Sequence, residues 1–408
     1  MNKTSILALV AVMTLLVGSA GLQAGDSQVF SVRDSGATGD GVTLDTKAIQ
    51  DALDRCGKAG GGTVVIPKGT YLSGAVFVKS RTTLLIEEGA VLKGSEEKKD
   101  YPVIDSRFMG TEQKCHASLI NVIDENDITI TGKGIVAGSG IGGAGSPTGP
   151  RVIEFIRCRN ILIENIKVTN TGRWTIHLLY CTNAVARGLD IRSTGPMADG
   201  IDPDSCTNVL ITDCIFETGD DCIAIKSGKG QQAVDIGIPC QNITITDCTM
   251  LDGHACVALG SEISGGIRNI YVRDCIFKNM HRGIDVKTKK GRGGYVENVT
   301  VENIKTYGIP NAILMRVNYP GNTGKLIEGP AGLSTIRNMT FKNFEIFNGG
   351  FGGVKGSEEN PIHDLTFINF KSDGKKDFKI QWVNGLVVKD FSSKEKENAV
   401  EIKNCVMK

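Results

Sequence analysis

A short pattern of apolar and polar residues recurs along the chain. Each copy starts with an asparagine or aspartate, alternates apolar with polar positions, and has a small or apolar residue six positions after its start. The alternating positions are rich in β-branched residues, which predicts β-strands and not helices. The clear copies start at Asn160, Asn183, Asn208, Asn242, Asn269, Asn298 and Asn338, and weaker ones at Asn126, Asp364 and Asn384.

The spacing of these copies predicts a solenoid. Successive clear copies start 23, 25, 34, 27, 29 and 40 residues apart, and loop insertions account for the longer intervals. A coil of about 22–28 residues with three short strands is typical of a parallel β-helix, in which each coil stacks on its neighbours. A β-propeller needs antiparallel blades of about 40 residues, longer than most of these intervals. We therefore predict an all-β, single-stranded parallel β-helix.

The repeated asparagines are expected to form a ladder at one bend, each side-chain amide bonding to the next coil. Three of them, Asn242, Asn298 and Asn338, also start Asn-x-Thr sequences that match the acceptor motif for N-glycosylation. We interpret these three as buried ladder residues and not as sugar acceptors.

The segment before the regular coils, residues 25–102, is expected to hold an N-terminal cap and the first coils. Asp45 can cap a short helix that ends at Gly60–Gly62. The apolar residues on one face of this helix are Ala48, Ile49, Ala52, Leu53 and Cys56. An amphipathic helix of this kind closes the open end of a solenoid core. We assign residues 25–408 to a single domain.

Residues 1–24 have the features of a secretory signal peptide. Lys3 supplies the positive charge, Ile6 to Val17 form an apolar run, and small and polar residues lead to a cleavage site after Ala24. The apolar run is too short for a confident membrane span. We predict an exported protein, periplasmic or secreted, with no membrane anchor after cleavage.

Composition narrows the choice of partners. The chain of 408 residues has 46 basic and 45 acidic residues, so no basic excess indicates a nucleic-acid partner.

Export permits disulfides among the twelve cysteines. However, Cys214, Cys248 and Cys275 share one position of the repeat, where parallel side chains disfavour bonding and favour packing as small apolar residues. We predict a monomer.

Polar residues also recur at fixed distances from the ladder asparagines. In three successive coils the twelfth position holds Asp220, His254 and His281, the thirteenth holds Asp221, Ala255 and Arg282, and the eighteenth holds Lys226, Gly260 and Lys287. Asp199 follows Asn183 by sixteen positions in the coil before. Equal positions in neighbouring coils lie roughly 4.7–4.9 Å apart, the spacing of paired strands. One wall is therefore predicted to gather three carboxylates, a histidine, an arginine and two lysines.

Crowded carboxylates suit acid–base chemistry. Asp220 and Asp221 are adjacent and should lie close to Asp199, so one pKa should rise and yield a proton donor beside carboxylates that remain bases. Hydrolysis of a glycosidic bond requires such an acid and base. Two alternatives stay open: a solvated surface cluster, or a calcium site that also uses Asp202 and Asp204. No Cys-x-x-Cys or His-x-x-x-His spacing supports another metal, and we predict no metal site.

Several motifs together resemble one family. In order they are residues 29–41 (VFSVRDSGATGDG), 151–156 (RVIEFI), 174–177 (WTIH), 199–205 (DGIDPDS), 219–225 (GDDCIAI), 253–254 (GH) and 282–287 (RGIDVK). Their order and spacing are similar to those of the polygalacturonase family, the pectin-degrading glycoside hydrolases of family 28. The resemblance covers nearly the whole chain after the signal peptide.

The resemblance implies a right-handed parallel β-helix and hydrolysis in a single displacement with inversion. It implies that Asp220 protonates the leaving oxygen and that Asp199 and Asp221 position and deprotonate the attacking water. It further implies that His254 supports the protonation state of the acid, that Lys287 contacts substrate, and that no metal or cofactor is needed.

Three positions depart from the family pattern. The family's Asn-Thr-Asp is Met197-Ala198-Asp199 here, and its Gly-His-Gly ends in Ala255. The arginine of its Arg-Ile-Lys, which would pair with a uronate carboxylate, is replaced by Asp285. An aspartate there is expected to repel a uronate, and Arg282 or Arg292 could compensate.

One coil before Asp199, Trp174 and His177 could line a sugar subsite, or Trp174 could be partly buried at the base of a loop. Our candidate substrate-binding residues are therefore Lys287, Arg282, Asp285, Trp174 and His177.

The leading hypothesis is an exported hydrolase of galacturonan-type pectic polysaccharide. The residues of the motifs at 199–205 and 219–225 resemble those of exo-acting family members more than those of endo-acting ones, which slightly favours attack at chain ends. One alternative keeps the fold and mechanism but acts on rhamnogalacturonan or xylogalacturonan, as Asp285 suggests. Another is a non-catalytic glycan-binding β-helix, which would have no need of Asp199, Asp220, Asp221 and His254 together. A lyase of the same fold would need calcium and a basic proton abstractor.

Overall fold

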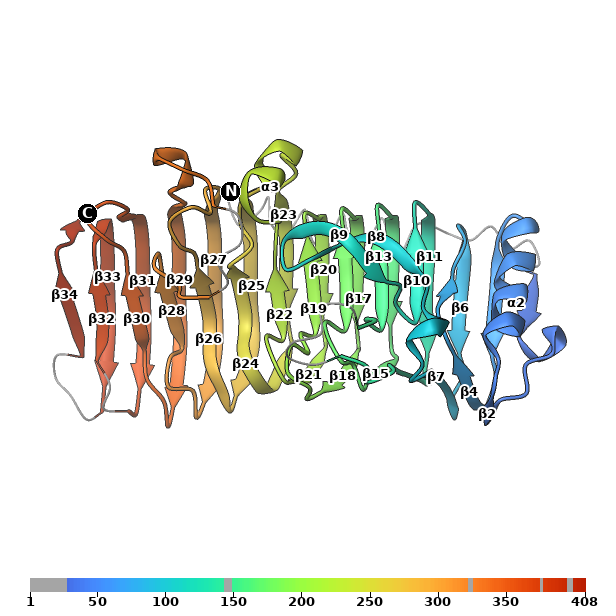
Figure 1. Ribbon diagram of the computed structural model, residues 1–408. Helices are drawn as coiled ribbons and strands as arrows, with labels where there is room; N and C mark the ends of the chain where they lie inside the picture. The colour runs from blue at the N-terminus through green and yellow to red at the C-terminus, as the bar shows by residue number, and fades with distance from the viewer. Residues whose placement is uncertain (1–27, 143–148, 322–325, 375–376, 395–398) are drawn as a thin grey trace.

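The protein is a long rod of stacked coils (Figure 1). This computed structural model describes residues 28–142, 149–321, 326–374, 377–394 and 399–408, and the predicted signal peptide lies outside them. Within these residues, 33 strands pair in one continuous parallel sheet that winds into a right-handed parallel β-helix. The predicted fold class is confirmed.

Each coil contributes strands to up to three columns that run along the rod. The first column contains β5 (Val76–Phe77), β10 (Ile120–Ile123), β13 (Ile153–Ile156), β16 (Ile176–Leu179), β19 (Ile201–Asp204), β22 (Ile223–Ile225), the end of β24 (Thr249–Gly260), β26 (Met280–Lys287), β28 (Ile313–Arg316), β30 (Gly352–Lys355), β32 (Phe378–Gln381) and β34 (Val400–Lys403). This column carries the candidate site described below.

The second column contains β1 (Val29–Ser31), β3 (Gly62–Ile66), β6 (Thr82–Ile86), β11 (Asn126–Gly132), β14 (Arg159–Glu164), β17 (Thr182–Arg187), β20 (Thr207–Thr212), β23 (Cys240–Thr246), β25 (Ile267–Lys278), β27 (Tyr295–Tyr307), β29 (Thr335–Phe347), β31 (Ile362–Ser372), β33 (Val383–Ser393) and β35 (Val406–Met407). The third contains β2 (Asp40–Leu44), β4 (Gly69–Ser73), β7 (Ala90–Gly94), β12 (Ile135–Ala137), β15 (Lys167–Thr169), β18 (Asp190–Ser193), β21 (Ile215–Thr218) and the start of β24.

The N-terminal end is closed by a helix, as predicted. Helix α2 (Thr46–Lys58) buries Ile49, Ala52, Leu53 and Cys56 against the first coils. The role of Asp45 was wrong: it precedes the helix, but its carboxylate accepts hydrogen bonds from the backbone N–H groups of Thr38 (2.8 Å) and Gly39 (2.9 Å) instead of capping α2. The carboxylate of Asp45 therefore stabilises the loop before the helix and not the first turn of α2.

The other helix is α3 (Gly230–Ile236), and short 3₁₀ turns lie at Arg33–Ser35, Lys98–Asp100 and Pro330–Gly332. Neither α-helix of the described chain has the length and apolar character needed to cross a membrane.

The asparagine ladder is confirmed. Asn183 donates to the side-chain oxygen of Asn160 (3.2 Å), and the contact repeats coil by coil as far as the pair Asn338–Asn298 (2.6 Å). Each ladder residue has a positive φ of 54–60°, a conformation that asparagine tolerates well. Burial was predicted wrongly: Asn298 and Asn338 are exposed, because the ladder follows the outer edge of the bend.

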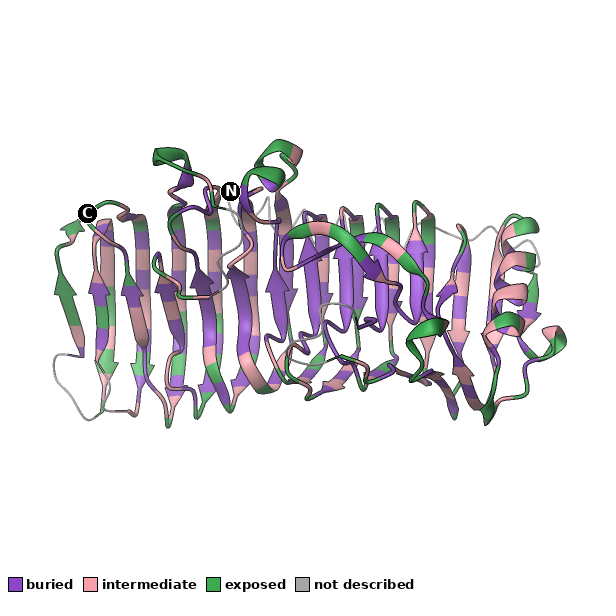
Figure 2. Cartoon of the chain, viewed as in Figure 1, coloured by how far each residue is buried: buried purple, intermediate pink, exposed green. Residues whose placement is uncertain are grey.

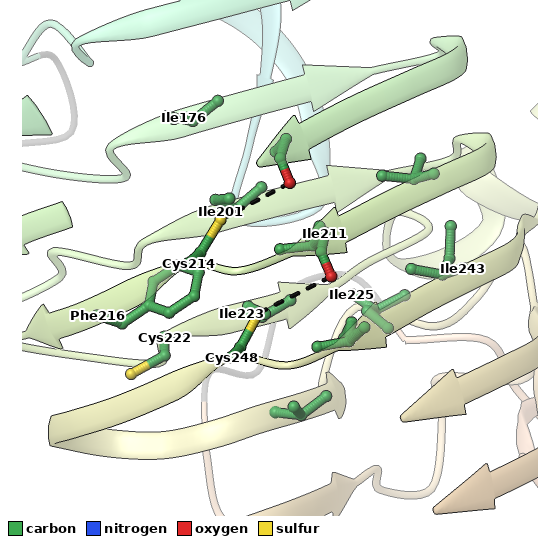
Figure 3. Close-up of a cluster of buried hydrophobic side chains, with 14 of the residues drawn as sticks. Ile176, Ile201, Ile211, Cys214, Phe216, Cys222, Ile223, Ile225, Ile243 and Cys248 are labelled. Atoms are coloured by element: carbon green, nitrogen blue, oxygen red, sulfur yellow. Dashed lines mark hydrogen bonds between the residues drawn. The ribbon is translucent and has the colours of Figure 1, made fainter. Parts of the chain in front are cut away.

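The core is a continuous cluster of buried aliphatic, aromatic and cysteine residues. Buried residues occur in strands along the whole rod (Figure 2). Cys214 and Cys248 lie among isoleucines and Phe216 (Figure 3), and their thiols donate to backbone carbonyls of neighbouring coils. All twelve cysteines are free and all but Cys405 are buried, which confirms the interpretation of Cys214, Cys248 and Cys275 as core residues.

An antiparallel hairpin interrupts the regular coils. Strands β8 (Val103–Phe108) and β9 (Thr111–His116) lie across the first column near β13, β16 and β19 (Figure 1). Buried polar contacts fix the hairpin there: Ser106 Oγ donates to Glu154 (2.5 Å), and Arg107 Nη1 donates to Asp204 (2.6 Å). The hairpin therefore covers the outer face of the first column on one side of the candidate site.

Candidate active site

The polar residues predicted to converge do lie in neighbouring coils. Ala255 pairs with Arg282, and Gly260 with Lys287, in register between β24 and β26. The backbone N–H of Gly200 donates to the carbonyl of Asp221, which places Asp199 one coil away from the Asp220–Asp221 bend. Parallel strands in register therefore bring these groups to one wall.

Asp221 is a buried carboxylate held in its ionised form. Its Oδ2 accepts from Lys287 Nζ at 2.8 Å, and its Oδ1 lies 3.3 Å from His254 Nδ1. Burial opposes ionisation, but the Lys287 charge and the two hydrogen bonds outweigh it and hold the pKa of Asp221 well below its usual range. Asp221 is thus a base across the ordinary pH range.

Asp220 has the opposite character. Its burial, together with the nearby charges of Asp199 and Asp221, raises its pKa to about 7. Its side chain is still about one-third exposed, so a ligand can reach it. Two adjacent carboxyls therefore separate into a proton donor and a base.

His254 joins both aspartates to Arg282. Its Nδ1 lies 3.5 Å from Asp220 and 3.3 Å from Asp221, and its Nε2 lies 2.5 Å from Arg282 Nη1. Because a guanidinium can only donate, this geometry fits the tautomer with the proton on Nδ1 and a lone pair on Nε2. Arg282 therefore fixes the ring orientation beside the acid.

Asp199 is held by a lysine from the next coil. Lys226 Nζ lies 2.8 Å from Asp199 and 2.5 Å from the fully buried Asp202, and it sits 3.3 Å from the centre of the Trp174 ring. Burial and the neighbouring Asp199 raise the pKa of Asp202 well above its usual value. Lys226 thus fixes Asp199 at the edge of the site.

A metal fits these groups poorly. Asp220, Asp221 and His254 are close enough to share an ion. Their ligand atoms, however, already face Lys287 and Arg282, which compete with a cation. The calcium alternative meets the same difficulty, since Asp202 pairs with Lys226 and Asp204 with Arg107.

Comparisons with known proteins identify the family of the chain. The model of the glycosyl hydrolases family 28 matches residues 56–384. The chain belongs to this family. It is 33% identical to a probable polygalacturonase of Vitis vinifera, over 83% of this chain and 73% of the relative. This family-28 protein is a glycosidase of the polygalacturonase type, as the motifs indicated.

Two further relatives are named as exo-acting. An exo-poly-alpha-D-galacturonosidase of Dickeya chrysanthemi is 25% identical, over 85% of this chain and 68% of the relative. The crystal structure of an exopolygalacturonase from Thermotoga maritima matches with a TM-score of 0.77 and 27% identity, covering 94% of this chain and 92% of that one.

The interpretation of Asp285 needs correction. Asp285 has no exposed surface, and Arg316 Nη2 lies 2.8 and 2.9 Å from its two oxygens. Arg282 (3.5 Å) and Lys287 (4.0 Å) are also near it. A buried carboxylate does not contact a substrate, and three neighbouring cations offset its charge, so the structure gives no support for the expected repulsion of uronates. Arg292 is fully buried and cannot compensate at the surface.

Trp174 and His177 are also buried. Trp174 packs against Phe108 of the hairpin, and Lys226 covers its ring. His177 has no exposed surface, and its Nδ1 lies 2.9 Å from Glu154. The expectation that they line a sugar subsite does not fit this burial, because the hairpin covers them. Trp174 instead packs against Lys226, which holds Asp199, and His177 pairs with Glu154 beneath the hairpin.

Arg316 and Tyr319 lie near the site and were not predicted, whereas Lys226 was expected on the wall and Asp202 only as a ligand of the calcium alternative. Lys226 and Asp202 orient Asp199, while Arg316 and Tyr319 lie beside Lys287 and Asp285. The ring of Tyr319 is 5.8 Å from Lys287 Nζ and 5.2 Å from the Arg316 guanidinium. Arg316 extends the cationic part of the wall one coil toward the C-terminus.

The pKa values predict the pH dependence of hydrolysis. With Asp220 as the acid and Asp221 as a base, kcat/KM is expected to fall about tenfold per pH unit above pH 7, where Asp220 loses its proton. No loss due to Asp221 is expected down to about pH 4. The measurement is kcat/KM on a pectic oligosaccharide from pH 4 to 9. Undiminished activity at pH 9 would exclude Asp220 as the acid.

Proposed function

We propose that the protein is an exported enzyme that hydrolyses galacturonan-type pectic polysaccharide from a chain end, with inversion at the anomeric carbon. The observation that carries the proposal is the pair of adjacent carboxyls with opposed pKa shifts, Asp220 raised and Asp221 lowered. The family, and relatives named polygalacturonase, support the substrate class.

In this proposal Asp220 donates its proton to the glycosidic oxygen as the C–O bond breaks. Asp199 and Asp221 orient a water on the opposite face of the sugar and remove its proton as its oxygen bonds to the anomeric carbon. Lys226 Nζ holds Asp199 at 2.8 Å, and Lys287 Nζ holds Asp221 at 2.8 Å. His254 and Arg282 orient the acid, and Lys287 and Arg282 lie where they can contact substrate.

Attack at a chain end is supported by the hairpin. Strands β8 and β9 cover the first column near β13, β16 and β19, where they bond Glu154 and Asp204. Strands β26 and β28, which carry Arg282, Lys287 and Arg316, lie beyond the hairpin (Figure 1). A polymer can then extend in one direction only from Asp199 and Asp220. Two of the relatives reported above are exo-acting by name, which supports the same proposal.

Product analysis tests this function. Homogalacturonan should give monomeric galacturonate from the start, with little early loss of viscosity, and NMR should show the anomer opposite to the linkage first. The double variant Arg107→Met/Asp204→Asn removes both charges of the buried pair that fixes the hairpin, and should add longer products. Early oligomers from the wild type would contradict chain-end attack, and retention would contradict inversion.

The alternatives lose their main support. Rhamnogalacturonan and xylogalacturonan were suggested by repulsion at Asp285, and that carboxylate is buried and paired with Arg316. A non-catalytic glycan binder gains nothing from a carboxyl with a pKa near 7 beside a permanently ionised one. We expect the enzyme to act as a monomer after the signal peptide is removed.

A further inference from the structure

We propose that Arg316, held in place by Asp285, binds the carboxylate of the uronate on the polymer side of the bond that is cleaved. The inference rests on the proposed function, in which the substrate is a galacturonan. Arg316 ends β28 and pairs in register with Lys287, so it lies one coil beyond Lys287 in the same outward-facing row. The hairpin covers the coils on the other side of the site, so a polymer bound as proposed extends toward Arg316.

The charges at this point favour an anion. Arg282, Lys287 and Arg316 surround Asp285 at 3.5, 4.0 and 2.8 Å. Lys287 also serves Asp221 at 2.8 Å. The three cations Arg282, Lys287 and Arg316 face the two carboxylates Asp285 and Asp221, so this group has a net charge of one positive unit. An anionic sugar bound here would complete the balance, and a neutral sugar would not.

Arg316 is the cation best placed to receive that anion. Lys287 is only 8% exposed and already bonds Asp221. The Arg282 side chain is 20% exposed, but its Nη1 is engaged with His254 Nε2. The Arg316 side chain is 17% exposed. Both contacts of Arg316 with Asp285 use Nη2, and Nη1 makes no hydrogen bond within the residues that the structure describes. The Tyr319 ring, 5.2 Å away, further restricts the guanidinium. A planar guanidinium can bond one carboxylate and offer its other N–H groups to a second.

Asp285 is then a positioning residue. It touches no substrate, but it fixes the direction of Arg316 and so lowers the entropy lost when the uronate binds. Removing its charge should weaken discrimination between charged and neutral sugars.

The test compares trigalacturonate with its methyl ester, which has the same shape and no charge. Arg316→Gln should lower kcat/KM on trigalacturonate roughly 10- to 100-fold, because it removes a hydrogen bond between charged groups. The kcat/KM on the methyl ester should not change. Arg316→Lys should recover part of the loss, and Asp285→Asn should give a smaller loss of the same kind. The matched control is Lys355→Gln, an exposed lysine one coil further along the same row.

Binding to an inactive background separates this inference from the proposed function. In Asp220→Asn enzyme, calorimetry should show trigalacturonate binding weakened by the added Arg316→Gln and unaffected by Lys355→Gln. Equal losses on trigalacturonate and ester, or unchanged affinity, would overturn the role of Arg316. If the wild type releases no galacturonate from homogalacturonan, the proposed function fails, and the calorimetric comparison still decides whether Arg316 binds uronates.

Discussion

Asp220→Asn is expected to lower kcat on homogalacturonan by roughly 10²- to 10⁴-fold, the contribution of a positioned general acid. Asparagine keeps the shape of the side chain but has no proton to give to the leaving oxygen. KM should change little, because the cationic residues of the wall remain. The measurement is reducing-end release under saturating substrate. A variant with normal kcat would remove Asp220 from the mechanism.

The same substitution should stabilise the fold in a pH-dependent way. Because the pKa of Asp220 is raised from 3.8 to about 7 on folding, its favourable contribution is present below pH 4 and is lost as the pH rises through 7. Asparagine cannot ionise, so the gain in Tm should be small at pH 4 and largest at pH 8. The control is Asp213→Asn, an exposed residue of the same coil with a positive φ, which should change neither activity nor Tm.

The columns of the fold and much of the wall could be predicted because a solenoid repeats its register. Counting eighteen positions from the ladder asparagine found Lys226 and Lys287, and the paired strands confirm the offset between Gly260 and Lys287. The same count from Asn298 reaches Arg316, and the next coil could have been included on the same reasoning. The prediction stopped one coil early.

Other features leave no signal in the repeat. The hairpin is an insertion whose partners, Glu154 and Asp204, lie tens of residues away, so no periodicity predicts where it packs. The burial of Trp174 and His177 depends on that hairpin. The environment of Asp285 depends on three cations from two coils. Comparing position 285 alone with the family motif predicts that Asp285 repels a uronate, which is the opposite of the effect that we infer from these cations.

Asp285→Arg is expected to damage both fold and activity. The substitution would place a fourth cation among Arg282, Lys287 and Arg316, with no exposed surface to relieve the repulsion. Loss of one partner from a buried ion pair costs about 3–5 kcal/mol. The free energy of unfolding should fall by at least this amount, measured by denaturant titration, and galacturonan turnover should fall with it because Lys287 and Arg282 lose their positions beside Asp221 and His254.

Two variants separate charge from shape in this prediction. Asp285→Asn is nearly isosteric and should fold, so any loss of activity it shows on uronates reflects the freed Arg316. Glu401→Arg makes a similar charge reversal at an exposed position in the same column of strands, where its partner Lys379 is also exposed, and should cost little. Improved uronate turnover by Asp285→Arg would mean that Asp285 repels the substrate after all. The buried ion pairs around it predict the reverse, since a carboxylate that organises three cations is what makes this wall attractive to an anionic polymer.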